Sequence, residues 1–262
     1  MVTKITSEES TLKLAVLIDA DNARAEIIEG LLTEIASYGE AIVKRIYGDF
    51  TSQLSAQWKK VLHKHAIKPM QQFAFTTGKN ATDSALIIDA MDLLYTHRFG
   101  GFCIVSSDSD FTSLANRMRE EGLQVFGFGE KKTPEAFRNA CNKFIFTEIL
   151  QPVVQPVQLV NKSLKRAIQP IKRAKITENS TQEFPKDFVL EALNNSYDDT
   201  GWAYLGTFGG YLTKLKPDFD SRLYGFKKLS DLVRGKLEIF EIEERVHPGT
   251  NAKALYLRSR QK

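Results

Sequence analysis

Short apolar runs alternate with helical patterns along the first 150 residues, and this alternation restricts the fold more than any other feature. The segments between the runs, at 23–38, 53–65, 83–97, 111–121 and 134–143, repeat their apolar residues with helical spacing. Strands separated by single helices form βαβ units, in which a parallel sheet is covered by helices. We therefore predict an α/β domain of about five or six strands. The predicted strands are LAVLI at 14–18, AIVKRIY at 41–47, IKPMQQFAF at 67–75, GFCIVSS at 101–107, LQVFGFG at 123–129 and FIFTEI at 144–149.

The remainder of the chain predicts a linker and a second, smaller domain. Residues 151–183 contain three Gln-Pro dipeptides and several basic side chains without any sustained period, which is typical of a linker. Residues 184–262 contain three helical patterns followed by two strand patterns, the order of a winged-helix domain. The predicted organisation is a mostly parallel α/β domain at 1–150, a linker at 151–183 and a winged-helix domain at 184–262.

Charge and composition narrow the class of protein. The formal net charge of +4 comes from the second half, since the first 150 residues are slightly acidic, and this favours a polyanionic partner. The two cysteines, Cys103 and Cys141, lie in apolar runs and cannot form a disulfide scaffold. The apolar stretch at 14–18 is far shorter than the roughly 20 residues that span a bilayer. We expect a cytoplasmic protein with no membrane association.

Acidic residues follow two of the predicted strands. Asp19 and Asp21 follow the first strand, Asp108 and Asp110 follow the fourth, and Asp83 begins a helix after the third. The ligand site of an open α/β sheet lies at the carboxyl ends of its strands, so these carboxylates are expected to converge. Several carboxylates at close range need a counter-charge, and a hard divalent cation with oxygen ligands supplies it. The pattern predicts a Mg²⁺ or Mn²⁺ site.

Other interpretations of these acids remain open. Each Asp taken alone is also typical of a helix cap, because a carboxylate accepts the free N–H groups of a first turn. Asp49, Asp89 and Asp92 are weaker candidates. Asp89 lies ~120° around its helix from Asp83, so both reach one site only if that helix runs along its edge. The histidines and cysteines show no zinc-ligand spacing.

Four blocks of the first domain resemble the NYN branch of the PIN-like ribonucleases. They are LIDADN at 17–22, KNATD at 79–83, VSSDSDFTSLANRMREEGLQVFGFG at 105–129 and TPEAFRNACNKFIF at 133–146. The resemblance implies a PIN-like α/β/α sandwich whose acids bind Mg²⁺ or Mn²⁺ and hydrolyse RNA. The matching positions are Asp19, Asp83, Asp108 and Asp110 for the acidic cluster, Asn22 for a strand-end asparagine and Asp89 for a further helical acid. Ser107 and Ser109 stand where that family often has glycine.

Phosphodiester hydrolysis gives each of these residues an expected role. It requires an activated water, neutralised phosphate oxygens and a stabilised leaving group, which cations held by carboxylates can supply. Asp19 and Asp108 are expected to be the principal metal ligands, and Asp83 and Asp110 further ligands or water-orienting groups. Asn22 is expected to be a polar hydrogen-bonding group. Lys79 and Lys131 are expected near phosphate or simply in solvent.

The second domain resembles the OST-HTH, or LOTUS, winged-helix module over about 184–258, with GFKKLSDLV at 225–233 as the most specific block. The resemblance implies RNA binding or, in some relatives, a protein partner. Phosphate contacts and base stacking then need basic and aromatic side chains. The candidates are Lys214, Lys216, Arg222, Lys227, Lys228 and Arg234, with Tyr211 and Tyr224 for stacking.

The sequence thus predicts a metal-dependent ribonuclease with an appended RNA-binding module. One alternative is an adaptor of little catalytic activity that binds RNA or protein. The other is a haloacid-dehalogenase-type phosphatase, which also places Asp-x-Asp after its first strand but whose first Asp is a covalent nucleophile. The sequence has no evident cap insertion of the kind such a phosphatase needs.

Overall fold

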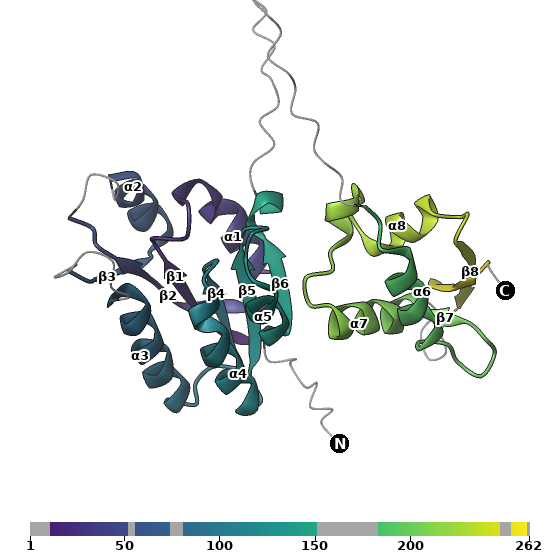
Figure 1. Ribbon diagram of the computed structural model, residues 1–262, viewed down its shortest axis with the longest axis horizontal. Coiled ribbons are helices and arrows are strands. Elements are labelled where there is room, and N and C mark those ends of the chain that lie inside the picture. The colour runs from purple at the N-terminus through teal and green to yellow at the C-terminus, as the bar shows by residue number, and fades with distance from the viewer. Residues whose placement is uncertain (1–10, 52–55, 74–80, 151–182, 247–252, 261–262) are drawn as a thin grey trace, which may run out of the picture.

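The computed structural model describes residues 11–51, 56–73, 81–150, 183–246 and 253–260 (Figure 1). The first domain alternates strands and helices as the apolar pattern predicts. Its strands are β1 (Lys13–Asp19), β2 (Glu40–Gly48), β3 (Lys68–Gln71), β4 (Gly101–Val105), β5 (Gln124–Gly129) and β6 (Lys143–Phe146). Its helices are η1 (Ala25–Ile27), α1 (Ile28–Ile35), α2 (Ala56–His65), α3 (Ala81–Tyr95), η3 (Ser109–Phe111), α4 (Thr112–Glu120), α5 (Glu135–Ala140) and η4 (Thr147–Leu150).

The six strands form one sheet in the order β3-β2-β1-β4-β5-β6, and every neighbouring pair is parallel. The predicted α/β fold with a mostly parallel sheet is therefore confirmed. The chain winds outward from β1 to β3 and then returns to place β4 on the other side of β1. The carboxyl ends of β1 and β4 consequently flank the point where strand order reverses, which is where open α/β sheets bind ligands.

Alternation along β1 assigns its side chains to the two faces of the sheet. Leu14, Val16 and Ile18 pack with α1 and α2 in one apolar cluster. Ala15 and Leu17 pack on the opposite face with α3, α4 and α5. Figure 1 shows these two groups of helices on either side of the sheet. Because successive side chains of a strand point to opposite faces, Asp19 falls on the α3 side together with Ala15 and Leu17.

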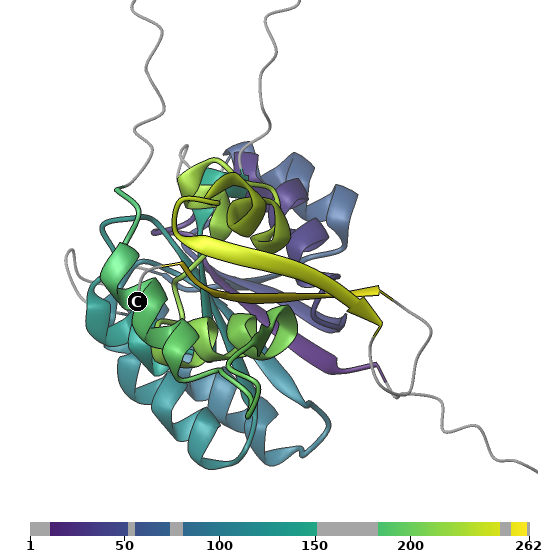
Figure 2. The same ribbon diagram turned by 90° about the vertical axis from the view of Figure 1, so that its right-hand side faces the viewer.

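The second domain contains helices and a small antiparallel sheet, as expected for a winged helix. A short strand, β7 (Ala203–Tyr204), pairs with β9 (Lys253–Ser259), which pairs with β8 (Phe240–Val246). Strands β8 and β9, drawn in yellow shades, cross the front of Figure 2. The helices are α6 (Lys186–Asn194), α7 (Leu205–Leu215), η5 (Ser221–Tyr224) and α8 (Leu229–Gly235).

Some predicted boundaries differ from the structure. The run 144–149 does not remain extended, because β6 ends at Phe146 and 147–150 turn into η4. An apolar run cannot mark this end, since Thr147 and Leu150 are buried in the short helix just as strand residues would be. The predicted linker at 151–183 lies, apart from Glu183, outside the described residues. No helix among the described residues is long and apolar enough to cross a membrane.

Gly129 at the end of β5 provides a test of this packing. A Cβ there would lie 2.6 Å from the Ser106 carbonyl oxygen, 2.6 Å from Thr133 Oγ1 and 2.9 Å from Phe144 Cζ. Gly129→Ala should therefore destabilise the fold by about 1–3 kcal/mol, the usual cost of overpacking. Gly210→Ala is the matched control, because a Cβ in α7 meets nothing within 4 Å and should stabilise the helix. Urea unfolding of both variants measures this, and equal midpoints would contradict it.

Candidate active site

Asp19 ends β1 as a fully buried carboxylate whose oxygens are all hydrogen-bonded. Its Oδ1 accepts the backbone N–H of Asp21 at 3.0 Å. Its Oδ2 accepts Asn22 Nδ2 and Ser106 Oγ, each at 2.8 Å. Burial raises the pKa of Asp19, and these three hydrogen bonds act in the opposite direction by favouring the charged form. The carboxylate is thus fixed in place between the ends of β1 and β4.

A chain of hydrogen bonds continues from Ser106 into the second acidic pair. The Ser106 hydroxyl, which donates to Asp19, accepts the backbone N–H of Asp108 at 3.1 Å. Asp108 then caps the short helix η3, because its Oδ1 accepts the backbone N–H of Asp110 at 2.9 Å. The cap predicted as an alternative role for these acids is therefore present. It uses one oxygen of Asp108 and leaves the other to face the site.

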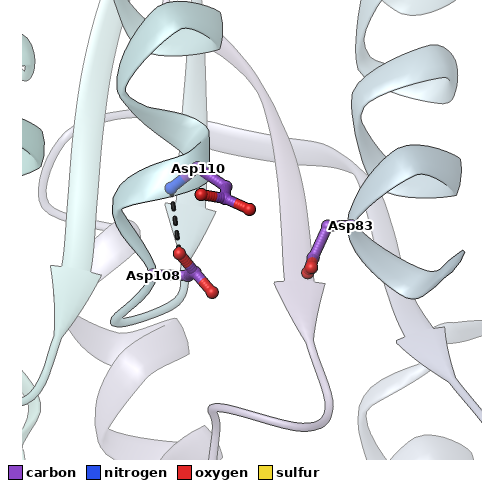
Figure 3. A group of neighbouring side chains, drawn as sticks. All are labelled: Asp83, Asp108 and Asp110. Carbon is purple, nitrogen blue, oxygen red and sulfur yellow. Dashed lines mark hydrogen bonds between the residues drawn. The ribbon is translucent and has the colours of Figure 1, made fainter. Parts of the chain in front are cut away.

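Three carboxylates from two elements converge at this edge of the sheet (Figure 3). Asp83 comes from the first turn of α3, and Asp108 and Asp110 come from the segment after β4. One ligand oxygen from each lies within 4.8 Å of the others. Asp83 and Asp108 are partly buried, and Asp110 is exposed. This spacing suits several carboxylate oxygens around one cation.

The electrostatics of the cluster are unfavourable without a counter-charge. Burial above all, together with the negative charges of Asp19, Asp108 and Asp110, raises the pKa of Asp83 to about 6. Among the described residues, no Lys, Arg or His forms a salt bridge with Asp83 or Asp108. A divalent cation would relieve this repulsion, so the donor set fits a hard metal ion.

Three of the four expected metal ligands, Asp83, Asp108 and Asp110, form the group of converging oxygens. The expected role of Asp19 as a principal ligand beside Asp108 stays a prediction. Asp19 lies close enough to act on the pKa of Asp83. Asn22 donates to Asp19, which agrees in kind with its expected hydrogen-bonding role. Lys79 lies outside the described residues.

The weaker acidic candidates have other partners. Asp89 accepts hydrogen bonds from the Arg45 guanidinium and the Tyr47 hydroxyl of β2, so it faces that strand and not the cluster. Asp49 closes a turn by accepting from Thr51 and Gln71. Asp92 is exposed on the outer side of α3. The interpretation of Asp92 as a surface residue agrees with its position.

Ser106 and Ser107 contribute to this region, although the sequence predicts no function for either of them. Both are buried after β4. Ser106 connects Asp19 to the Asp108 backbone, and the Ser107 hydroxyl accepts the backbone N–H of Glu130 at 2.9 Å. The sequence does contain a signal for this role, since two polar side chains directly follow an apolar strand. Buried polar side chains in such positions usually form hydrogen bonds within the protein.

The candidates for RNA contact in the second domain divide into accessible and engaged side chains. Lys214, Lys227 and Lys228 are exposed. Lys216 lies over the Phe188 ring at 5.9 Å, and Arg234 pairs with Glu244 at 2.9 Å.

Two of the second-domain expectations are wrong. Arg222 is not a free phosphate contact, since it pairs with Asp220 and Glu34. Tyr224 is not a stacking platform, because it is 8% exposed and its ring packs against Phe184 and Phe219.

A parallel α/β domain with carboxylates clustered at its switch point is the architecture of a PIN-like nuclease domain. The chain belongs to the NYN domain family, whose family model matches residues 13–150. An OST-HTH/LOTUS domain model matches residues 180–252. Both resemblances drawn from the sequence are thereby confirmed. NYN domains are nuclease-type domains that generally use divalent metals, and OST-HTH domains bind RNA.

Comparisons with solved structures give partial matches. A solution NMR structure of an uncharacterized protein from Nitrosomonas europaea is 53% identical, covering 39% of this chain and 94% of that one, with a TM-score of 0.30. A crystal structure of a protein of unknown function from Vibrio parahaemolyticus is 18% identical, covering 52% and 93%, with a TM-score of 0.44. An NMR structure of residues 175–257 of a Chromobacterium violaceum protein is 29% identical, covering 32% and 87%, with a TM-score of 0.26. A search of curated proteins gave no match.

The raised pKa of Asp83 predicts a pH-dependent effect on stability. In metal-free protein the folded state keeps this proton up to about pH 6, whereas the unfolded chain loses it near 3.8, so Asp83 lowers stability as pH rises between these values. Asp83→Asn should stabilise the protein at neutral pH by about 1 kcal/mol, a value reduced for solvent screening. The gain should vanish near pH 4. Urea unfolding in EDTA measures it, with Asp92→Asn on the exposed side of α3 as the control.

Proposed function

We propose that this protein is a divalent-metal-dependent ribonuclease whose second domain binds the RNA. The observation that carries the proposal is the convergence of Asp83, Asp108 and Asp110 within 4.8 Å at the switch point of an NYN domain. Asp19, fully buried behind them, adds negative charge that such a site needs to hold a cation. RNA is the substrate class because the chain also contains an OST-HTH domain.

The residues present fit a hard cation such as Mg²⁺ or Mn²⁺. The donors are carboxylate oxygens, which these ions prefer over nitrogen or sulfur ligands. The raised pKa of Asp83 comes first from burial and then from the neighbouring carboxylates, and a bound cation would favour its charged form against both. When bound, the cation supplies charge neutralisation at the phosphate oxygens and favours ionisation of the attacking water.

The protein's own residues divide the remaining tasks. Asp108, Asp83 and Asp110 present the oxygens that hold the cation or accept a hydrogen bond from the attacking water. Asp19 shares in this site through its charge, and its position is fixed by Asn22 and Ser106. Because η3 is capped by Asp108, the side chains of Asp108 and Asp110 are held in one orientation before substrate binds. Such preorganisation avoids reordering during the reaction.

The alternatives account less well for the site. A haloacid-dehalogenase-type mechanism needs the first Asp as an accessible nucleophile, whereas Asp19 is 0% exposed with its oxygens hydrogen-bonded. An adaptor without catalytic activity would gain nothing from three carboxylates that repel one another in the folded state. For RNA binding, the exposed Lys214, Lys227 and Lys228 serve as phosphate contacts. Lys216, which lies over Phe188, and Arg234, which pairs with Glu244, are further phosphate contacts.

Cleavage is tested with full-length protein and short labelled RNA in the presence of Mn²⁺, of Mg²⁺ or of EDTA. The wild type should cleave only with metal. Asp108→Asn and Asp83→Asn should each lose at least the roughly 10–100-fold that accompanies even outer-shell changes at metal sites. Asp92→Asn is the matched control on α3 and should cleave normally. Wild-type rates in both Asp83→Asn and Asp108→Asn would reject the proposed site, and a protein that binds RNA but never cleaves it would be an adaptor.

Metal binding is tested separately from turnover. An ion that binds only the folded protein stabilises it by mass action, so Mn²⁺ should raise the melting temperature of the wild type. The double variant Asp83→Asn/Asp108→Asn should start from a higher melting temperature and gain nothing from Mn²⁺. A scanning-fluorimetry titration measures both. The same Mn²⁺ shift in the double variant would place the metal elsewhere.

A further inference from the structure

A groove between the two domains is a second charged feature of the molecule, separate from the acidic cluster. It has a volume of about 320 Å³, within the range of sites that bind nucleotide-sized groups. Lys143 at the start of β6 forms its wall on the NYN side. The OST-HTH side is formed by α7, by η5 and by the segment that leads into α8, including Gly209, Lys227 and Lys228.

Specific contacts hold the two walls of this groove together. The backbone N–H of Phe144 in β6 donates to the carbonyl of Pro217 at 3.0 Å. Arg138 of α5 pairs with Asp218, which is 5% exposed. Figure 1 shows α7 and the chain that follows it beside α5 and β6. A main-chain hydrogen bond and a buried ion pair define one relative placement of the domains, so the groove has a fixed shape.

A further ion-pair network includes two lining residues of the groove, Asp220 and Arg222. Arg222 of η5 donates to both carboxylate oxygens of Glu34, at 2.7 and 3.0 Å, and pairs with Asp220 at 2.6 Å. Burial opposes ionisation of Glu34, but the hydrogen bonds from Arg222 and Tyr38 outweigh it and hold the pKa of this carboxyl below its usual range. The charge of Arg222 is thus compensated by the two acids and contributes little to binding an anion.

The groove nevertheless has a net positive charge. Among the described residues, Lys143, Lys227 and Lys228 form no salt bridge. Lys143 Nζ lies 5.1 Å above the Tyr38 ring, and its charge acts on Glu34 without forming an ion pair with it. These three ammonium groups come from both domains and line one groove. Such an arrangement attracts a polyanion that passes between the domains.

We infer that this groove binds the sugar–phosphate backbone of single-stranded RNA, with Lys143 on one side and Lys227 and Lys228 on the other. The inference rests on the proposed function, because RNA is its ligand. It goes further by assigning a phosphate contact to the NYN domain outside its acidic site. The RNA is then held by both domains at once, and correct docking of the OST-HTH domain becomes a condition for full affinity.

The experiment measures anisotropy of a short fluorescein-labelled single-stranded RNA with full-length protein in EDTA, over a range of salt. Lys143→Glu should weaken binding about tenfold, equivalent to about 1.4 kcal/mol. Lys143→Gln, which cannot repel Glu34, should weaken RNA binding less than Lys143→Glu does. It should also make the slope of log K against log salt less steep by about 0.7 for each phosphate contact that is lost. Lys68→Glu, an exposed lysine on the opposite edge strand β3, is the matched control and should bind like the wild type.

Coupling between the two walls separates one shared groove from two independent patches. In a Lys227→Glu/Lys228→Glu background, Lys143→Glu should add much less than tenfold, because the RNA no longer lies along Lys143. Lys253→Glu, at an exposed position of β9 outside the groove, is the control for a single charge reversal in the second domain and should bind like the wild type. Full additivity, or Lys143 variants that bind like Lys68→Glu, would overturn the shared groove while leaving the ribonuclease proposal intact. A wild type that binds poly-glutamate but not RNA would overturn both the RNA groove and the RNA-binding part of the proposed function.

Discussion

The hydrogen bonds around the Asp19 carboxylate fix the geometry on which the candidate site depends. A buried, charged carboxylate is tolerated only when donors surround it, and here they come from its own loop and from the end of β4. Ser106 joins the two strands at the switch point, because it donates to Asp19 and accepts from the Asp108 backbone. The position of the second acidic pair therefore follows from the first. A change at Ser106 would alter both acids without touching either.

Charge repulsion and fold stability oppose each other at this edge of the sheet. The segments that carry Asp83 and Asp108 are positioned by apolar packing, since α3 contributes Leu86 and Ala90 to the core beneath them. That packing partly buries Asp83 and brings the carboxylates together, and burial followed by their mutual repulsion raises the pKa of Asp83. An arrangement that costs stability in the metal-free protein is expected where binding matters, because the bound cation recovers the energy.

Sequence reasoning could predict the convergence of the acids because it follows from topology alone. Parallel strands end at one edge of a sheet, so Asp19 and Asp108 had to meet wherever β1 and β4 became neighbours. It could not predict that Asp89 pairs with Arg45 and Tyr47, because the partner strand of a helix depends on tertiary packing. Tyr224 was misplaced for the same reason, as its burial comes from Phe184 and Phe219 elsewhere in the second domain. Apolar periodicity could not predict that β6 ends at Phe146, because the short helix that follows also buries its residues.

The second domain contacts the first at an exposed edge of its sheet. Strand β6 is an edge of the sheet, and an exposed edge offers unpaired N–H groups to any passing strand. Pro217 supplies a carbonyl to the Phe144 N–H at this edge, and proline has no N–H through which pairing could continue. The contact therefore pairs one N–H of the edge strand without extending the sheet. The contact of the second domain with the first thus lies at the β6 edge of the NYN sheet, where Arg138 also pairs with Asp218.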